Sequence, residues 1–216
     1  MPQFTLYSHG LGPNPWKVAY FLEELGLDYE TKYMVFDDNP KNGVKSAEFL
    51  KLNPNGRVPA LQDHKTGKVV WESVPCLLYL QRHYDQSGKY GFDQDGEGWE
   101  WLFWQASGLG PYTGQLAWFT FYHHEQVQSA KDRYQKELER NLGVLEGHLK
   151  GKEYVVENKL TLVDFNMMAW LPFAGMLNGK NDNYIKEAGF PSVQAYMEKM
   201  LALPSVKTAK SKAPKE

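Results

Sequence analysis

Cysteine is almost absent from this sequence: Cys76 is the single thiol among 216 residues. One cysteine cannot form a disulfide within the chain, which excludes the class of small secreted domains held together by disulfides. Cys76 lies in an apolar run and has no second cysteine at CxxC spacing. We therefore expect a buried small side chain rather than a redox nucleophile.

Long apolar runs and an excess of charge are also missing. The run from Val74 to Leu80 is far shorter than the ~18–20 residues that span a bilayer. Residues 1–5 lack the basic and apolar regions of a signal peptide. The 24 basic and 26 acidic residues give a net charge of −2, unlike the basic field of a nucleic-acid-binding protein. These absences predict a cytoplasmic protein without nucleic-acid or membrane partners.

Motifs for metal or nucleotide binding are lacking as well. His123, His124 and Glu125 are adjacent, and adjacent residues on a helix do not face the same way. The run from Gly10 to Gly12 is too short for a nucleotide-binding loop. We therefore expect no metal site.

Aromatic residues are abundant, with 7 Trp, 13 Tyr and 11 Phe. A disordered chain does not carry so many, so they must fill a core or line an apolar pocket. At ~100–200 residues per domain, the length allows one large domain or two small ones.

The first part of the chain alternates strand and helix patterns. Short apolar or alternating runs predict strands, helical spacing predicts helices, and the order is β-α-β-α-β-β-α. Ser73 is predicted to cap the third helix, with Pro75 in its first turn. The predicted strands cover residues 4–7, 29–36, 58–61 and 68–71, and the predicted helices cover residues 16–25, 47–51 and 73–84.

The second part shows helical periods only. Residues 86–98 are polar and glycine-rich and predict a linker, and a helix from residue 99 is expected to break at Gly108–Pro111. An amphipathic stripe predicts a helix over 129–149, formed by Tyr134, Leu138, Leu142, Leu145 and Leu149. Thr161 to Asp164 predicts a capping box. A final helix is predicted over 192–203, followed by a frayed tail over 207–216.

Several motifs together resemble the glutathione transferase family. The runs NPNGRVPAL (residues 53–61) and WES (71–73) resemble its glutathione-binding signature. The runs GPNPWKV (12–18) and WQASGLGPYTGQ (104–115) resemble the fungal class related to the yeast nitrogen-regulator prion protein. The resemblance covers almost the whole chain. It implies a thioredoxin-like α/β domain over residues 1–86, an all-helical domain over 97–216, glutathione as co-substrate and a homodimer.

Glutathione needs an anion site, a carboxylate for its amine and a backbone partner for its cysteinyl unit. Ser73 at a helix N-terminus offers a hydroxyl and N–H groups to a carboxylate, and Glu72 can pair with the ammonium. Val58 offers its backbone to the tripeptide, and the resemblance implies that its bond to Pro59 is cis. Arg57 completes the predicted glutathione-binding set.

The resemblance places the thiol-activating group at the start of the first helix. Serine-type relatives carry a hydroxyl where this sequence has Gly12, so we predict that the amide of Asn14 donates to the sulfur instead. Asn14 also fits a helix N-cap, with Pro15 as the first helical residue. Tyr7 and Ser8 are alternatives, although Tyr7 fits a core aromatic better.

A second departure concerns a histidine that reaches glutathione in relatives. The corresponding position here is Val44, and Lys45 beside it is either a substitute or an ordinary surface lysine.

The aromatic residues after the expected helix break predict a pocket for an apolar electrophile. We select Tyr112, Trp118, Phe119 and Tyr122. The resulting hypothesis is a glutathione-dependent transferase, peroxidase or disulfide reductase acting on hydrophobic or peroxide substrates. The alternative is a weakly catalytic glutathione-binding protein that carries ligands or regulates a partner.

Overall fold

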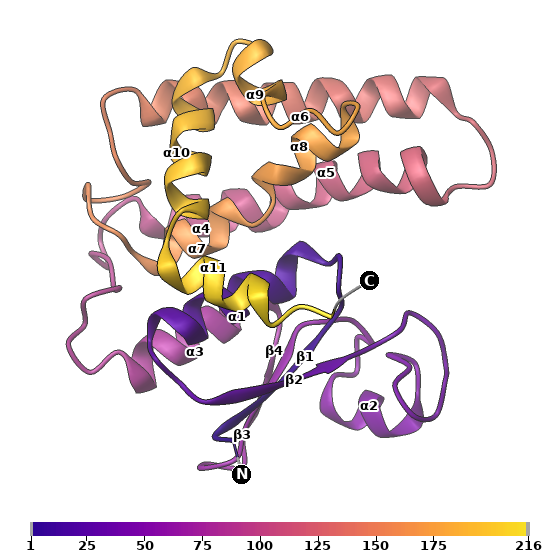
Figure 1. Ribbon diagram of the computed structural model, residues 1–216, viewed down its shortest axis with the longest axis vertical. Coiled ribbons are helices and arrows are strands. Elements are labelled where there is room, and N and C mark those ends of the chain that lie inside the picture. Colours follow the sequence, from indigo (N-terminus) through magenta and orange to yellow (C-terminus); the bar gives the residue numbers. More distant parts are fainter. Residues whose placement is uncertain (1, 215–216) are drawn as a thin grey trace. The chain divides into compact units, whose positions relative to one another are not determined.

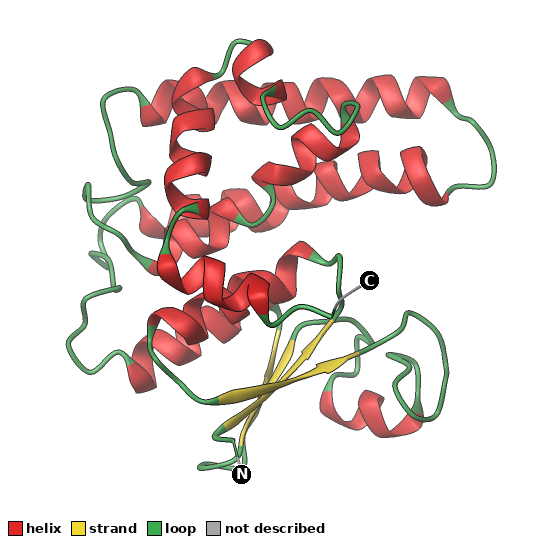
Figure 2. Cartoon of the chain, in the orientation of Figure 1, coloured by secondary structure: helices red, strands yellow, loops and turns green. Residues whose placement is uncertain are grey.

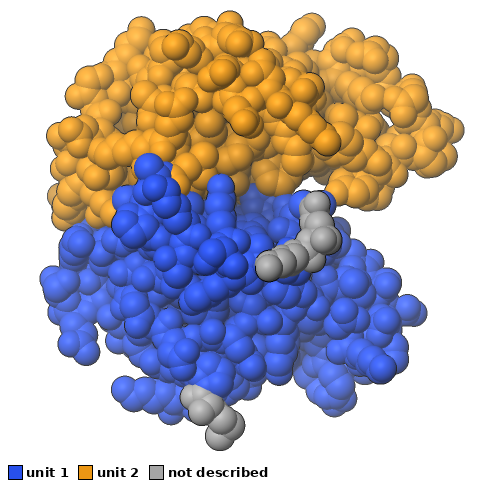
Figure 3. Space-filling model, viewed as in Figure 1, with its two compact units in different colours: residues 1–91, 202–216 blue, residues 92–201 orange. Residues whose placement is uncertain are grey.

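The computed structural model describes residues 2–214. Its contacts divide the chain into two compact units, residues 1–91 with 202–216 and residues 92–201 (Figure 3). This division differs from the expected limits because the last helix packs with the first unit rather than with the helical one.

The first unit is built on a four-stranded sheet, whose strands are yellow in Figure 2, and the strand order is β2-β1-β3-β4. The strands are β1 (Phe4–Ser8), β2 (Tyr29–Tyr33), β3 (Ala60–Asp63) and β4 (Val69–Trp71). β1 pairs with β2 in parallel, and the other two pairs are antiparallel. β2 ends three residues before the expected Phe36, because the chain then turns back and Val35 pairs with Gly43 as an isolated bridge.

Four helices complete this unit: α1 (Pro13–Glu24), α2 (Ala47–Leu52), α3 (Ser73–Tyr84) and α11 (Pro204–Ser211). α1 packs against β1, α3 and α11 (Figure 1). Its apolar residues Val18, Phe21 and Leu22 are fully buried, as helical spacing predicts. The predicted order β-α-β-α-β-β-α and the thioredoxin-like fold class are confirmed.

The expected fraying of the C-terminal tail is wrong for residues 207–211, which are helical. α11 runs to Ser211, and its Val206 and Ala209 are buried one turn apart. Lys212 pairs with Glu23 of α1. These two apolar residues at helical spacing give the lysine-rich helix a buried face, and α11 packs against α1. Residues 215 and 216 lie outside the described part of the chain.

The second unit is helical throughout its described elements. Its helices are α4 (Gly98–Trp104), α5 (Gly110–Ala117), α6 (Gln128–Leu149), α7 (Leu162–Met168), α8 (Leu171–Leu177), α9 (Tyr184–Glu187) and α10 (Pro191–Leu201). Across residues 2–214, no helix combines the length and apolarity needed to cross a bilayer.

The expected break at Gly108–Pro111 is wrong. α4 continues through a π-helical turn, Gln105–Leu109, directly into α5. The N–H of Gly110 bonds to the carbonyl of Gln105, five residues earlier, and Pro111 has no N–H to continue the α-helical pattern. The widened turn therefore absorbs the proline without ending the helix.

The capping box at the start of α7 is confirmed. Thr161 accepts from the N–H of Val163, and the Asp164 carboxylate accepts from the N–H of Thr161 at 2.8 Å and of Val155 at 2.9 Å. The Tyr196 hydroxyl also donates to Asp164, at 3.1 Å. Burial raises the pKa of Asp164 to about 6, against the opposing effect of these hydrogen bonds.

Candidate functional site

The sheet brings three separate sequence segments to one end. Tyr7 of β1 lies beside Ala60 of β3, which lies beside Trp71 of β4. β3 runs antiparallel to both neighbours, so the end of β1, the start of β3 and the end of β4 coincide. The loop at residues 9–12, the dipeptide 58–59 and the dipeptide 72–73 therefore converge.

The first segment leads into α1. Gly12 is the N-cap, Pro13 the first helical residue and Asn14 the second, so the predicted N-cap role of Asn14 is wrong. Because α1 begins at Pro13 rather than at Pro15, Asn14 lies in its first turn, at the positive end of the helix dipole. Two bonds fix the preceding loop: the N–H of Gly12 donates to the carbonyl of His9 at 3.2 Å, and the Trp16 indole donates to that of Gly10 at 2.9 Å.

The second segment holds the Val58–Pro59 peptide bond, which is cis as predicted. The buried side chain of Asn53 stabilises the loop that leads to this peptide bond. The Asn53 amide donates to the carbonyl of Arg57 at 2.7 Å, and its oxygen accepts from the N–H of Asn55 at 3.0 Å. The sequence motif that contains Asn53 predicted no separate role for this side chain.

The third segment is the turn between β4 and α3. Glu72 is the N-cap residue and Ser73 the first helical residue, so the predicted cap role of Ser73 is corrected by one position. Glu72 has φ 74° and ψ 133°, a region that side chains rarely adopt. Its side chain is exposed, whereas Ser73 is buried at the first turn of α3. An exposed carboxylate thus stands beside a hydroxyl at a helix N-terminus.

A buried lysine lies against this turn. Lys17 of α1 is 1% exposed, and its ammonium donates to the Ser73 hydroxyl at 3.4 Å. Burial lowers the pKa of Lys17 to about 7, and the negative charge of Glu72 opposes that shift. Sequence reasoning missed Lys17. A lysine among the apolar residues that α1 buries was a signal, although spacing in the sequence does not indicate its partner Ser73.

Comparison with known proteins places this geometry in a family. The model of the glutathione S-transferase N-terminal domain matches residues 2–82, and that of the C-terminal domain matches residues 110–204. The chain is 44% identical to glutathione S-transferase 2 of Schizosaccharomyces pombe, over 96% of this chain and 94% of the relative. It is 42% identical to glutathione S-transferase 1 of the same organism, over 96% of this chain and 95% of the relative.

Two solved structures from Phanerochaete chrysosporium agree with this assignment. The glutathione transferase URE2P6, in complex with oxidized glutathione, matches with a TM-score of 0.89 and 42% identity over 99% of this chain and 98% of that one. Ure2p5, cocrystallized with 1-(S-glutathionyl)-2,4-dinitrobenzene, matches with a TM-score of 0.85 and 37% identity over 98% and 94%. The chain belongs to the glutathione S-transferase family. Within it, this transferase falls in the fungal class related to Ure2p, as its motifs indicated.

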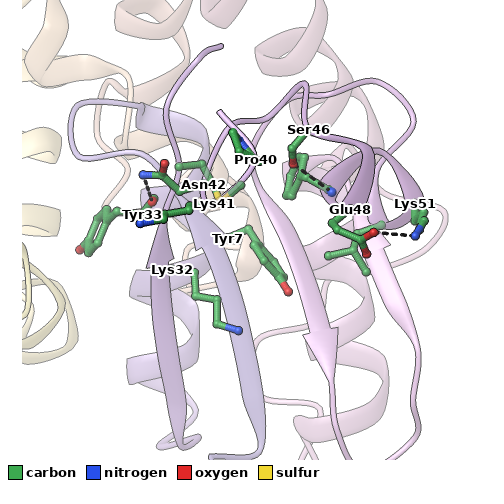
Figure 4. A pocket seen from close by; sticks show the side chains of 12 residues that line it. Tyr7, Lys32, Tyr33, Pro40, Lys41, Asn42, Ser46, Glu48 and Lys51 are labelled. Atoms are coloured by element: carbon green, nitrogen blue, oxygen red, sulfur yellow. Dashed lines mark hydrogen bonds and ion pairs between the residues drawn. The ribbon is translucent and has the colours of Figure 1, made fainter. Parts of the chain in front are cut away.

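The side chain of Tyr7 of the transferase contacts α2. Its ring contacts Phe49 of α2 at 5.4 Å between centroids, and its hydroxyl donates to Gln62 at 3.4 Å. The phenol lines a cavity of about 540 Å³ beside α2, together with Lys32 and Glu48 (Figure 4). Ser8 is buried at the end of β1. The placement of Tyr7 favours its interpretation as a packing aromatic.

Lys45 lies at the loop that carries Val58 and Pro59. Its ammonium donates to the carbonyl of Asn55 at 3.0 Å, whereas neighbouring Val44 is buried in the core. Val44 therefore cannot replace a ligand-binding histidine, and Lys45 is the side chain of this pair that reaches the loop.

Arg57 takes part in an exposed aromatic stack that the sequence did not predict. Its guanidinium lies over the Phe36 ring at 5.8 Å, and Phe36 contacts the His9 ring at 4.6 Å. Phe36 is 52% exposed, and partial burial lowers the pKa of His9. This stack lies beside the loop that precedes α1.

The four predicted pocket residues form two groups in the helical unit. Tyr112 and Phe119 both contact Tyr134 of α6, at 6.3 and 5.8 Å between ring centroids. Trp118 and Tyr122 contact each other at 6.0 Å, and both are exposed. The structure adds Tyr134, which sequence reasoning assigned to the core stripe of α6.

Cys76 is a free, fully buried thiol whose pKa burial raises. This agrees with the expected role as a small core residue. Within residues 2–214, no group of three or more metal-ligating side chains is found.

Proposed function

We propose that this transferase binds glutathione at the convergent end of its sheet. The observation that carries the proposal is the Glu72–Ser73 turn, where an exposed carboxylate adjoins a buried hydroxyl at the start of a twelve-residue helix. In the proposed complex, Glu72 pairs with the γ-glutamyl ammonium. Ser73 and the N–H groups of α3 receive the neighbouring carboxylate. Val58, before the cis Pro59, pairs with the cysteinyl backbone, and Arg57 and Lys45 supply positive charge for the glycine carboxylate.

Asn14 is assigned to the sulfur. A glutathione thiol has a pKa of about 8.5, so little thiolate is present at neutral pH. The first turn of α1 offers the positive end of a helix dipole, and the Asn14 amide supplies a donor. The thiolate attacks an electrophilic carbon, a C–S bond forms, the leaving group departs with its electron pair and the thiol proton passes to solvent.

The co-substrate is proposed to be a hydrophobic electrophile or peroxide bound by the aromatic residues of the helical domain. Two groups of aromatic contacts support this assignment, because apolar pockets are lined mainly by aromatic side chains. One group comprises Tyr112, Phe119 and Tyr134, and the other comprises Trp118 and Tyr122. Relatives of this transferase are described with glutathione conjugates, which supports carbon electrophiles as one substrate class.

A panel of three substrates tests the reaction type. A chlorodinitrobenzene, cumene hydroperoxide and a mixed disulfide of glutathione report conjugation, peroxide reduction and disulfide reduction. Turnover of at least one, abolished when glutathione is omitted, supports the proposal. Tight glutathione binding by calorimetry with no turnover of any substrate would favour the weakly catalytic carrier instead, a result consistent with the missing hydroxyl at Gly12.

We also propose that the transferase forms a homodimer. Phe36 and Trp71 of the first unit are 52% and 39% exposed, and Phe103 of the second unit is 60% exposed. A two-fold interface buries such apolar surface. Light scattering at micromolar concentration is expected to give about twice 24.9 kDa, and the monomer mass would refute the dimer.

A further inference from the structure

Lys17 is a fully buried charge that the proposed chemistry has not used. Its side chain is 1% exposed on α1, between neighbours that are otherwise apolar, and its ammonium reaches the Ser73 hydroxyl. Burying an ammonium is unfavourable unless its charge is satisfied. Glu72 is a charged group that acts on Lys17, and Glu72 and Ser73 are the residues assigned to the γ-glutamyl end of glutathione.

We propose that Lys17 is a positioning residue of the glutathione site, which orients the Ser73 hydroxyl and takes up a proton when a carboxylate docks at the start of α3. This inference rests on the proposed binding of glutathione by Glu72 and Ser73. It assigns to the site a buried group whose charge changes on binding.

The direction of the proton transfer follows from the charges. In the free protein the pKa of Lys17 is about 7, so at pH 8 about nine-tenths of the molecules hold a neutral amine. A docked carboxylate adds a second negative neighbour beside Ser73, which favours the ammonium and raises the pKa of Lys17. Binding at pH 8 therefore takes a proton from the buffer, and affinity falls as pH rises above 7.

Three other titratable groups on α1, α3 and α11 do not account for this proton uptake, namely Tyr20, Cys76 and Lys212. On α3, burial holds Cys76 as a neutral thiol. On α1 itself, burial raises the pKa of Tyr20, which stays a neutral phenol. On α11, Lys212 is paired with Glu23, and partial burial lowers the pKa of Lys210, which makes Lys210 a suitable control.

Calorimetry with S-hexylglutathione measures the proton directly. The S-alkyl group removes the thiol ionisation, and titrations at pH 8 in phosphate and in Tris, which differ in ionisation enthalpy, give the protons taken up per ligand. The ligand amine, with a pKa of about 8, also gains protons when it pairs with Glu72. That contribution is the same in every Lys17 variant, so the comparison between variants isolates Lys17.

We expect the wild type to take up about half a proton more than Lys17→Met and Lys17→Arg, and Lys210→Met to match the wild type. Lys17→Met should bind about tenfold more weakly than the wild type at pH 6.5 and within about threefold at pH 9. Lys17→Arg retains its charge at all pH values and should restore affinity at pH 6.5 with a flatter pH profile.

The outcomes separate the two proposals. If the wild type does not bind S-hexylglutathione, the proposed function fails. If it binds, but proton uptake is the same in the wild type and in the Lys17 variants, the role of Lys17 is refuted while the site stands. If Lys17→Met does not fold by circular dichroism, Lys17→Arg decides alone: proton uptake equal to that of the wild type would overturn the inference.

Discussion

Two substitutions of Glu72 should differ in their effect on the stability of the fold but not in their effect on the affinity for glutathione. With φ 74° and ψ 133°, this residue holds a conformation that disfavours any side chain by about 1–3 kcal/mol. Glu72→Gly and Glu72→Ala both remove the carboxylate, but only glycine relieves the backbone strain. Glycine in turn loses about 0.5–1 kcal/mol through the greater freedom of the unfolded chain. We expect the glycine variant to be more stable than the alanine variant by about 1 kcal/mol.

For a chain of this size, that difference corresponds to roughly 2–4 °C in Tm. Differential scanning calorimetry of both variants measures it. Titration with glutathione should show the same loss of affinity in both, about 5- to 150-fold, because an ammonium loses its charged partner in each.

A matched control lies in α6. Lys136 is exposed in the interior of that helix, where glycine is expected to be less stable than alanine by about 1 kcal/mol, the opposite sign. The reasoning fails if Glu72→Gly is no more stable than Glu72→Ala while the Lys136 pair behaves as expected. It also fails if either Glu72 variant binds glutathione as tightly as the wild type.

Three further predictions concern the thiol, the helical unit and pH. Asn14→Ala should raise the pKa of the bound glutathione thiol by about one to two units, and Gly12→Ser should lower it. The loop accepts a serine, since Gly12 has φ −75° and a Cβ there meets only ordinary contacts. Ultraviolet thiolate absorbance against pH measures both shifts. Gly175→Ala should lower the free energy of unfolding by about 1–3 kcal/mol, because its Cβ would lie 2.4 Å from a backbone oxygen. Gly147→Ala, which has open space in α6, should raise the free energy of unfolding by about 1 kcal/mol, and urea denaturation measures both. Since Lys17 binds fewer protons folded than unfolded between pH 7 and 10, wild-type stability should gain up to about 1.4 kcal/mol per pH unit there from this group, a gain absent in Lys17→Met.

The elements that could be predicted are those that local pattern determines. The α6 stripe of Leu138, Leu142, Leu145 and Leu149 is buried as expected, and the capping box at Thr161 and Asp164 forms, because both depend on residues within a few positions of each other. The failures came where the pattern is ambiguous. Gly108 to Pro111 signals a break by composition, yet a π-helical turn accommodates it without one. The lysine-rich tail forms α11, which packs against α1, an element distant in the sequence.

The site divides in the same way. Glu72, Ser73, Val58 and Pro59 belong to contiguous motifs, so sequence could propose them together, and the sheet register then brings their segments to one end. Lys17 could not be placed by spacing, because its partner Ser73 is 56 residues away and the two meet only when α1 packs against α3. Burial is a property of the packed fold, and burial alone moves the pKa of this lysine to the range where binding can change its charge. The residues that we propose to contact glutathione can thus be predicted from motifs, whereas Lys17, which we propose to tune those contacts, is identified only from the packing.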